Sequence, residues 1–448
     1  MTDGFVAGVA GYFSGNVAEP CWDRVGRVSD PATPVRVLFV EQAVAFGGAF
    51  VVIAELIRRL RRDLVQATVV TAMDAGFVEE RLGSAAPAWP TRHVLDYVRM
   101  TRLSRQLVNL GVPRRLAGYL VSGLAAVANV GYSFRLARTV LRQRVDVIHV
   151  NNGTEHLESN LVFLAFARRC VVHAHGAGKP SRLQRVFLNR VARVIAISDD
   201  VRRQLESGGV DPQRIVVVSN PVALPGSDSC DPSAARARVR RQYGVPDDAL
   251  VFSIFGRIVR WKGHREFLLA AADVIRAVPN AYAMIVGGTA DLDAGQLVEL
   301  RHMARELDIE HRVVFTGFVA DVASHYYAAD VVAHCSIEPE PFGLVIIEAM
   351  ACGVPVVAAN RGAPLEIITD GVDGLLVGPE RTDQLAGAIK DLLEDPPRRK
   401  ELADRAREVA LGRYDPDRYA RRMEAIYLEV ACTRRAGSHH EERARVAG

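Results

Sequence analysis

The sequence lacks the features that mark several common protein classes. Its six cysteines form no C-x-x-C pair, which argues against a disulfide framework or a zinc cluster and favours a reducing compartment. The start, MTDGFVAGVAGYF, has an acidic Asp3 and no basic segment, so it does not match a secretory signal. Excess charge is also missing, because 56 basic and 52 acidic residues leave a net charge of +4 over 448 residues. We therefore expect no nucleic-acid partner.

Familiar signatures for nucleotides and metals are missing as well. The stretch from Gly176 to Lys179 lacks the spacing of a P-loop, and Pro180 would disrupt the helix that follows a P-loop. No G-x-G-x-x-G run occurs, so neither a nucleotide hydrolase nor a dehydrogenase is indicated. Asp291 and Asp293 resemble a D-x-D metal site, but such pairs arise often by chance, as again at Asp415 and Asp417, and this one is followed by Ala-Gly and not by a strand. We therefore expect no required metal and no other cofactor.

The sequence does contain a repeated alternation of short apolar runs and helical stretches. The first run, residues 35–40, is followed by glycines and a helical segment, which is the opening of a βαβ unit. A segment rich in Pro, Gly and Ser, residues 220–233, divides the alternation and predicts a linker. Further expected strands are 67–71, 145–150, 171–174, 194–196 and 215–218 before it, and 250–255, 283–286, 313–315, 331–334, 354–357 and 374–377 after it.

This pattern predicts two α/β domains of similar size. We expect a flexible leader over residues 1–34, an N-terminal domain over 35–222 and a C-terminal domain over 245–412. The apolar spacing after residue 412 predicts one amphipathic helix over 413–430. The polar residues 431–448 predict a disordered tail.

The densest group of chemically informative residues lies between 338 and 368. Glu340 and Glu348 bracket a Pro-Phe-Gly-Leu turn and the start of an apolar helix. Gly343 at this helix start leaves backbone N–H groups free, and with the helix dipole these favour a phosphate. Glu348 lies in the apolar run LVIIEAMA, where an unpaired charge is costly, so we expect it to have a partner. A phosphate flanked by carboxylates that bind hydroxyls indicates a sugar nucleotide.

A second group follows the strand expected over residues 250–255. Gly256 permits a turn, and Arg257 and Lys262 come where the strand ends, at the edge where α/β sheets bind ligands. In isolation these would be ordinary basic residues of a surface loop. A planar guanidinium and a compact ammonium together suit a diphosphate, and the two glutamates lie in the same domain. We therefore interpret this loop as functional.

Together with Gly317-Phe318-Val319, these two groups resemble the retaining, GT-B-fold glycosyltransferases of the group 1 or family 4 class. The resemblance covers residues 35–430 and is strongest over 251–378. It implies two Rossmann-like domains that face each other across a cleft, with the acceptor bound by the N-terminal domain and the donor by the C-terminal domain. It also implies that the helix over 413–430 crosses back to the N-terminal domain.

The resemblance implies a role for each matching residue. Glu340 would contact the donor sugar and Glu348 the nucleotide ribose, while Arg257 and Lys262 would neutralise the diphosphate leaving group. His175, at the end of a strand beside Gly176, matches the family's histidine near the reacting sugar, and His173 on the same strand face is the competing candidate. The other implied donor-binding residues are Gly256, Phe342, Gly343, Leu344, Val319 beside the base, and Gly47 and Gly48 near the diphosphate and acceptor.

The implied activity is transfer of a sugar, with retention of configuration, from a nucleoside-diphosphate sugar to a hydroxyl of a saccharide or lipid-linked saccharide. Polysaccharide or glycoconjugate synthesis in the cytoplasm would use such a reaction. Uridine and guanosine donors are both compatible with the sequence. Two alternatives remain open at this point. A sugar-nucleotide epimerase of the same fold would need dedicated acid/base carboxylates, and a non-catalytic sugar-nucleotide binder would be expected to lack Glu340, Lys262 or Arg257.

Residues 116–134 form an uncharged run of 19 residues between Arg115 and Arg135. Its length permits a membrane span, whereas its Gly and Ser residues and Asn129 favour a buried helix of the N-terminal domain. A third interpretation is docking on an anionic membrane surface, because arginines flank the run and precede it. We hypothesise weak peripheral contact at the inner face of the membrane, which would suit a lipid-linked acceptor.

Overall fold

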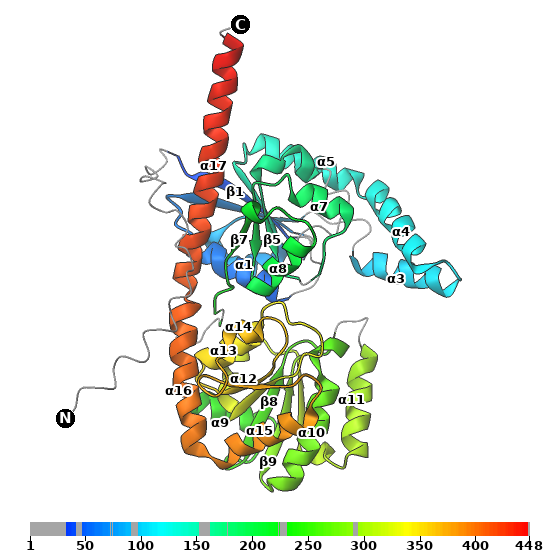
Figure 1. Cartoon of the computed structure of the whole chain (residues 1–448), viewed down its shortest axis with the longest axis vertical. Coiled ribbons are helices and arrows are strands. Elements are labelled where there is room, and N and C mark those ends of the chain that lie inside the picture. Colours follow the sequence, from blue (N-terminus) through cyan, green and yellow to red (C-terminus); the bar gives the residue numbers. More distant parts are fainter. Residues whose placement is uncertain are drawn as a thin grey trace, which may run out of the picture.

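The computed structural model describes residues 33–41, 47–71, 73, 75–90, 97–151, 162–176, 178–222, 224, 231–289 and 294–446. Within these ranges the chain forms two α/β units, drawn one above the other in Figure 1. The leader expected over residues 1–34 lies outside the described residues up to position 32, as do positions 223 and 225–230 of the expected linker. Asp291 and Asp293 lie outside them too.

The N-terminal unit contains a seven-stranded parallel sheet with the order β3-β2-β1-β4-β5-β6-β7. Because β1 pairs with both β2 and β4, the strand order reverses between β1 and β4, the place where such sheets bind ligands. The short strand β3 was not expected from the sequence. The strands are β1 Val35–Glu41, β2 Val65–Thr71, β3 Ala88–Pro90, β4 Val147–Asn151, β5 Cys170–Ala174, β6 Arg193–Ala196 and β7 Ile215–Val217.

The C-terminal unit contains a six-stranded parallel sheet with the order β10-β9-β8-β11-β12-β13. Its order reverses between β8 and β11. Most of its central strand residues are buried, which explains why the strands read as continuous apolar runs. The strands are β8 Leu250–Phe255, β9 Ala281–Val286, β10 Val313–Gly317, β11 Val331–His334, β12 Val356–Ala359 and β13 Leu375–Val377. The expected fold of two Rossmann-like units is confirmed.

Helices cover both sheets (Figure 1). In the C-terminal unit α10 packs against α15 and α13 packs against α16, so two helix pairs enclose the sheet. The helices discussed below are α1 Gly48–Arg59, α3 Tyr97–Asn109, α4 Arg114–Ala128, α5 Val130–Arg142, α7 Arg182–Leu188, α8 Asp199–Ser207, α9 Pro232–Gln242, α10 His264–Ala277, α12 Val322–Ala328, α13 Leu344–Ala351, α15 Thr382–Glu394, α16 Pro396–Arg413 and α17 Pro416–Val446.

The last helix, α17, is longer than the sequence predicts. It packs against α1, β1 and β4 of the N-terminal unit, where Met423 and Tyr427 are buried. Ion pairs of Arg59 with Asp417 and of Arg193 with Glu429 join it to the same unit. The prediction of disorder over residues 431–448 is wrong up to Val446, where α17 ends. The polar sequence after residue 430 offers no apolar helix face to bury. Its Ala, Arg and Glu residues are nevertheless good helix formers and can extend a helix that packing has already started.

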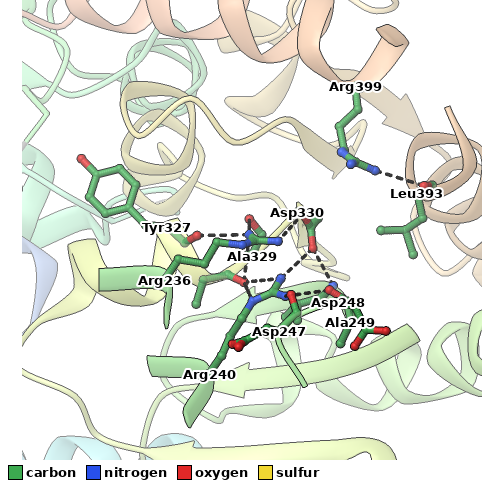
Figure 2. A network of polar contacts seen from close by, with 12 residues as sticks. Arg236, Arg240, Asp247, Asp248, Ala249, Tyr327, Ala329, Asp330, Leu393 and Arg399 are labelled. Carbon is green, nitrogen blue, oxygen red and sulfur yellow. Dashed lines mark hydrogen bonds and ion pairs between the residues drawn. The ribbon is translucent and has the colours of Figure 1, made fainter. Parts of the chain in front are cut away.

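A buried charge network joins α9 to the C-terminal sheet (Figure 2). Arg240 is 1% exposed, and its Nη2 lies 2.9 Å from Oδ2 of Asp330. Arg236 reaches the other carboxylate oxygen of Asp330 at 2.8 Å, and the backbone N–H of Val251 donates to Oδ2. Arg240 also donates to the carbonyl oxygens of Ala249 and Ala328. The network fixes the first helix after the linker against β8 and the start of β11.

The uncharged run over residues 116–134 forms two helices, not one. Helix α4 ends at Ala128 and α5 begins at Val130, with a bend of 56° between them. Among the described residues no single helix is long and apolar enough to cross a membrane, although this bent pair passes that test of length and composition together. The interpretation as one buried helix is wrong, because most of the large apolar side chains of α4 are exposed.

Candidate active site

Three glycines line the carboxyl ends of the neighbouring strands β8, β9 and β10. Gly256, Gly287 and Gly317 all have positive φ, at 129°, 150° and 70°. A Cβ on Gly287 would lie 1.9 Å from the carbonyl oxygen of Gly256, so only glycine fits there. The result is a close-packed edge of bare backbone that a ligand can approach. Gly287 was not predicted for the site, although the Gly-Gly pair directly after the expected strand 283–286 is a sequence signal for it.

Lys262 and Glu340 are brought together at this edge. Nζ of Lys262 lies 2.5 Å from Oε2 of Glu340, and the ammonium also lies over the Trp261 ring. Gly263 sets the position of Lys262, because it is left-handed at φ 74° and a Cβ there would meet the Cys335 carbonyl oxygen at 1.9 Å. The sequence predicted both residues for the site, but not that they form an ion pair.

Glu340 is held from several sides. Its Oε2 accepts hydrogen bonds from Ser336 Oγ at 2.9 Å and lies 3.1 Å from Nε2 of His334, which ends β11. Burial opposes ionisation of this carboxyl, but Lys262 and His334 outweigh it and hold the pKa of Glu340 well below its usual range. Glu340 is therefore a fixed carboxylate at neutral pH. His334 and Ser336 were not predicted, and their contacts with Glu340 depend on the folded turn.

The turn after Glu340 leads into α13. Gly343 caps this helix with φ 99°, and Leu344 is its first residue. The backbone N–H groups of Gly343 and Leu344 donate no hydrogen bond among the residues that the structure describes, as expected for a helix N-terminus. The Phe342 ring is buried and packs edge-to-face against Tyr414, with 5.8 Å between ring centroids. Phe342 can therefore offer a ligand its backbone but not its ring.

Glu348 lies in the second turn of α13, separate from the Lys262–Glu340 pair. The partner expected from its apolar surroundings is Tyr326 of α12, whose hydroxyl donates to Oε2 at 2.9 Å. Burial raises the pKa of Glu348 to about 8, against a smaller opposite effect of the Tyr326 hydrogen bond. At neutral pH the carboxyl is therefore largely protonated until a ligand donates hydrogen bonds to it.

The two other residues predicted for the donor side lie at the same sheet edge. Arg257 follows Gly256 directly and is exposed, and its side chain makes no hydrogen bond or ion pair within the described part of the chain. Val319 follows the Gly317 turn and packs, half-buried, against the core of the unit. A free guanidinium at this edge can bind an anion without first breaking an internal contact.

The N-terminal unit contributes the start of α1. Gly47 caps this helix and has open space where a Cβ would lie, whereas a Cβ on Gly48 would lie 2.8 Å from Cδ1 of Leu344. The N-termini of α1 and α13 therefore meet across the two units. The hydroxyl of Ser198 adds a second contact, because it donates to the carbonyl oxygen of Pro341 at 2.7 Å. This contact was not predicted.

His175 lies just beyond β5, and its surroundings fix its tautomer. Its Nε2 is 2.8 Å from Oδ1 of Asn151, and the amide Nδ2 of Asn151 donates to the Glu41 carboxylate at the end of β1. Because an amide oxygen only accepts, His175 must carry its proton on Nε2. Burial lowers the pKa of His175 to about 3, so the ring is neutral. Neither Asn151 nor Glu41 was predicted.

The competing candidate, His173, lies in the interior. Its ring is tilted by 36° against that of His175, with 4.0 Å between centroids, and meets the His149 ring edge-on at 5.3 Å. His173 is fully buried, and neither of its ring nitrogens has a hydrogen-bond partner among the described residues. Burial lowers the pKa of His173 well below its usual value. Of the two histidines, only His175 is partly exposed and can reach a ligand.

Within the described ranges, no group of three His, Cys, Asp or Glu side chains is arranged to hold a metal ion. The D-x-D pair at Asp291 and Asp293 lies outside those ranges. Arg257 and Lys262 place two cationic groups at the C-terminal sheet edge. These side chains can interact with a diphosphate directly.

Comparison with known proteins gives matches in both units. A family model described as "Glycosyl transferases group 1" matches residues 235–409, and one described as "Glycosyltransferase Family 4" matches residues 46–224. The chain is similar in fold to HepE from Anabaena in complex with UDP and glucose, with a TM-score of 0.69 and 26% identity. That similarity covers 87% of this chain and 98% of HepE.

Two curated relatives are similar over one region each. The chain is 36% identical over 237 residues to a D-inositol 3-phosphate glycosyltransferase of Kineococcus radiotolerans, which covers 49% of this chain and 53% of that protein. Over 192 residues it is 36% identical to a GDP-mannose-dependent alpha-(1-6)-phosphatidylinositol monomannoside mannosyltransferase of Mycolicibacterium smegmatis. This region covers 41% of this chain and 48% of that protein. The chain spans about half the length of the curated relatives it matches.

Proposed function

Because this chain belongs to the group 1, family 4 glycosyltransferases, we propose that it transfers a sugar from a nucleoside-diphosphate sugar to a hydroxyl acceptor with retention of anomeric configuration. The observation that carries this proposal is the Lys262–Glu340 ion pair beside the free N-terminus of α13. A fixed cation and helix N–H groups stabilise the charge that develops on a departing diphosphate. The paired carboxylate is positioned to accept hydrogen bonds from sugar hydroxyls.

The donor would lie along the C-terminal sheet edge. Arg257 and Lys262 would bind the diphosphate, Glu348 the ribose hydroxyls and Glu340 the sugar, while Val319 would flank the base. The complex of HepE with UDP and glucose supports a nucleoside-diphosphate sugar as the donor. The two cations would serve in place of a metal, and no other cofactor is part of the proposal.

The acceptor would approach from the N-terminal unit, near Gly47, Gly48 and His175. It would be a hydroxyl of a saccharide or of a lipid-linked saccharide. The names of the two curated relatives refer to D-inositol 3-phosphate and to phosphatidylinositol monomannoside, which supports a hydroxyl on a polyol or glycolipid. The neutral ring of His175 donates its Nε2–H to Asn151, so it would offer its other nitrogen, Nδ1, to the substrate as a hydrogen-bond acceptor and would not act as a cation.

The rate enhancement would come from positioning both substrates and from charge stabilisation on the leaving group. An epimerase would need acid/base carboxylates at the reacting sugar, and Glu340 is held ionised by Lys262 and is unsuited to donate a proton. A non-catalytic binder would have no reason to keep Glu340, Lys262 and Arg257 together. Sugar transfer is therefore favoured over both alternatives.

A turnover assay over a panel of UDP- and GDP-sugars, with and without candidate acceptors, tests the proposal. We expect release of nucleoside diphosphate that depends on one donor and accelerates with acceptor, and NMR of the product should show the anomeric configuration of the donor. Conversion of the donor sugar without an acceptor would indicate an epimerase. Binding without turnover of any donor, seen as thermal stabilisation alone, would indicate a sugar-nucleotide binder.

A further inference from the structure

Helices α3, α4 and α5 form an arm on the N-terminal unit. Helices α3 and α4 pack against each other and project away from the sheet (Figure 1). Helix α5 connects them to the body, because Tyr132, Leu136 and Val140 of its inner face are buried in the core. The arm is therefore anchored at one end, and α3 and α4 extend from it toward solvent.

The charge of the arm is entirely of one sign. Residues 97–144 contain no Asp, Glu or Lys. They contain nine arginines, and the whole chain has a net charge of only +4, so the rest of the chain is net negative. The arginines are Arg99, Arg102, Arg105, Arg114, Arg115, Arg135, Arg138, Arg142 and Arg144. Such a concentration of one sign favours an anionic surface as partner.

The arm also exposes its large apolar side chains. Tyr119, Val127 and Phe134 are 77%, 73% and 70% exposed. In α4 the residues Leu116, Leu120, Leu124 and Val127 recur three or four positions apart and form one exposed stripe. The buried stripe of the same helix consists of the smaller Ala117, Val121 and Ala125. A helix on the surface of a soluble protein normally buries its large apolar side chains, so α4 shows the reverse arrangement.

The arm is suited to lie on a bilayer and not to cross it. Together α4 and α5 have the length and composition of a bent span. However, Tyr132, Leu136 and Val140 would have to leave the core for α5 to enter the bilayer. An amphipathic helix pair that keeps this anchor can bury its exposed apolar stripe at the headgroup boundary, with its arginines at the lipid phosphates.

We propose that the α3–α5 arm docks the protein on a bilayer surface that contains anionic lipids. This inference rests on the proposed function and narrows it, because it selects a lipid-linked saccharide as the acceptor. A second copy of this chain fits the arm poorly, since a symmetric contact would bring two sets of nine arginines together. A nucleic acid would match the arginines but would leave the aliphatic stripe in water.

Vesicle flotation of the full chain tests the proposal. The probes are vesicles of phosphatidylcholine alone and of phosphatidylcholine mixed with phosphatidylglycerol. We expect binding to the mixed vesicles at low salt, weaker binding as salt rises, and little binding to phosphatidylcholine alone. The triple variant Tyr119→Ser, Val127→Ser, Phe134→Ser should reduce binding at least about tenfold, because three apolar side chains no longer enter the bilayer.

A matched triple variant controls for the loss of exposed apolar residues in general. Val298→Ser, Val372→Ser and Leu411→Ser change side chains of the C-terminal unit that are 67%, 53% and 53% exposed, and should bind vesicles as the wild type does. The pair Arg114→Glu, Arg115→Glu should abolish the preference for the anionic lipid. Equal binding by the arm variant and the wild type, or no binding at low salt, would overturn the proposal.

Two further measurements separate this inference from the proposed function and from other occupants. A dimer in sedimentation velocity that dissociates in the arm variant, or RNA binding that competes with the vesicles at equal affinity, would overturn the assignment to lipid. Transfer to a water-soluble acceptor should be unchanged in the arm variant. If sugar transfer proceeds but vesicles are not bound, the docking proposal is wrong and the proposed function stands. If vesicles are bound but no sugar is transferred, the proposed function is wrong and docking stands.

Discussion

Lys262 and Glu340, 78 residues apart in the chain, form an ion pair with 2.5 Å between Nζ and Oε2. The pair does two things at once. It keeps Glu340 ionised in a buried place, and it fixes Lys262 at the edge of the sheet beside α13. A diphosphate that arrives here would meet a cation that is already positioned, so little reorganisation is needed as charge develops on the leaving group.

Replacing Lys262 by Met should reduce turnover at least about 10²-fold, because about 3 kcal/mol of charge stabilisation at the leaving group is lost. Steady-state kinetics with the preferred donor measures this. The variant should also unfold at lower temperature, since the Glu340 carboxylate stays buried without its cation. The double variant Lys262→Met, Glu340→Gln should recover the stability but not the turnover. Arg260→Met, an exposed cation in the same short helix, is the matched control and should stay within about twofold of wild type.

Glu348 should make donor binding depend on pH. Its pKa is raised to about 8, so ribose hydroxyls that donate hydrogen bonds to the carboxylate must displace a proton. The affinity for the nucleoside-diphosphate sugar should therefore rise as pH increases from 6 toward 8, by at most about tenfold per pH unit. Burial lowers the pKa of His149 and His175 to about 3, so these groups do not titrate in that window. Calorimetry in two buffers of different ionisation enthalpy should detect the released proton.

Glu348 also predicts how the stability of the ligand-free protein changes with pH. The pKa of Glu348 in the folded state lies above its ordinary value of 4.5, so the folded state holds the proton more tightly. Its contribution to stability is fully present below about pH 4.5 and is lost as pH rises through about 8.

Two variants test the effect of Glu348 on donor binding. Glu348→Gln should bind the donor weakly, and its donor affinity should not depend on pH between 6 and 8. Tyr326→Phe removes the hydrogen bond that lowers the pKa and should move the rise in affinity to higher pH.

The sequence predicted the parts of this protein that local pattern determines. Buried parallel strands such as β8 and β11 read as continuous apolar runs, and the spacing from Glu340 to Glu348 is visible without a structure. Strand β3, three residues that end in Pro90, has no such pattern, since its pairing with β2 is what makes it a strand. Lys262 and Asn151, which contact Glu340 and His175, lie 78 and 24 residues away in the chain, so these pairs could only be found once the sheets were assembled.

Asn151 should act on catalysis through His175. Replacing Asn151 by Leu removes the acceptor that fixes the Nε2 proton of His175, so the ring can change tautomer and turnover should fall about tenfold. ¹⁵N NMR of the His175 ring should show an Nε2–H tautomer in wild type and a mixture in the variant. If Asn151 acts only through His175, the double variant with His175→Ala is no slower than His175→Ala alone. A further loss in the double variant would indicate that Asn151 contacts substrate itself.

Asp330 should dominate the stability of the C-terminal unit. Its carboxylate accepts hydrogen bonds from Arg236 and Arg240 (Figure 2) and from the Val251 N–H. Burial and the neighbouring Arg236 lower the pKa of Arg240. Asp330→Asn keeps the shape but leaves the buried guanidinium without an anion, which should cost about 3 kcal/mol. Asp273→Asn breaks an exposed pair with Arg276 and should cost less than about 0.5 kcal/mol. Scanning calorimetry should therefore show the transition of this unit at a lower temperature only for Asp330→Asn, and equal shifts for both variants would contradict the assignment.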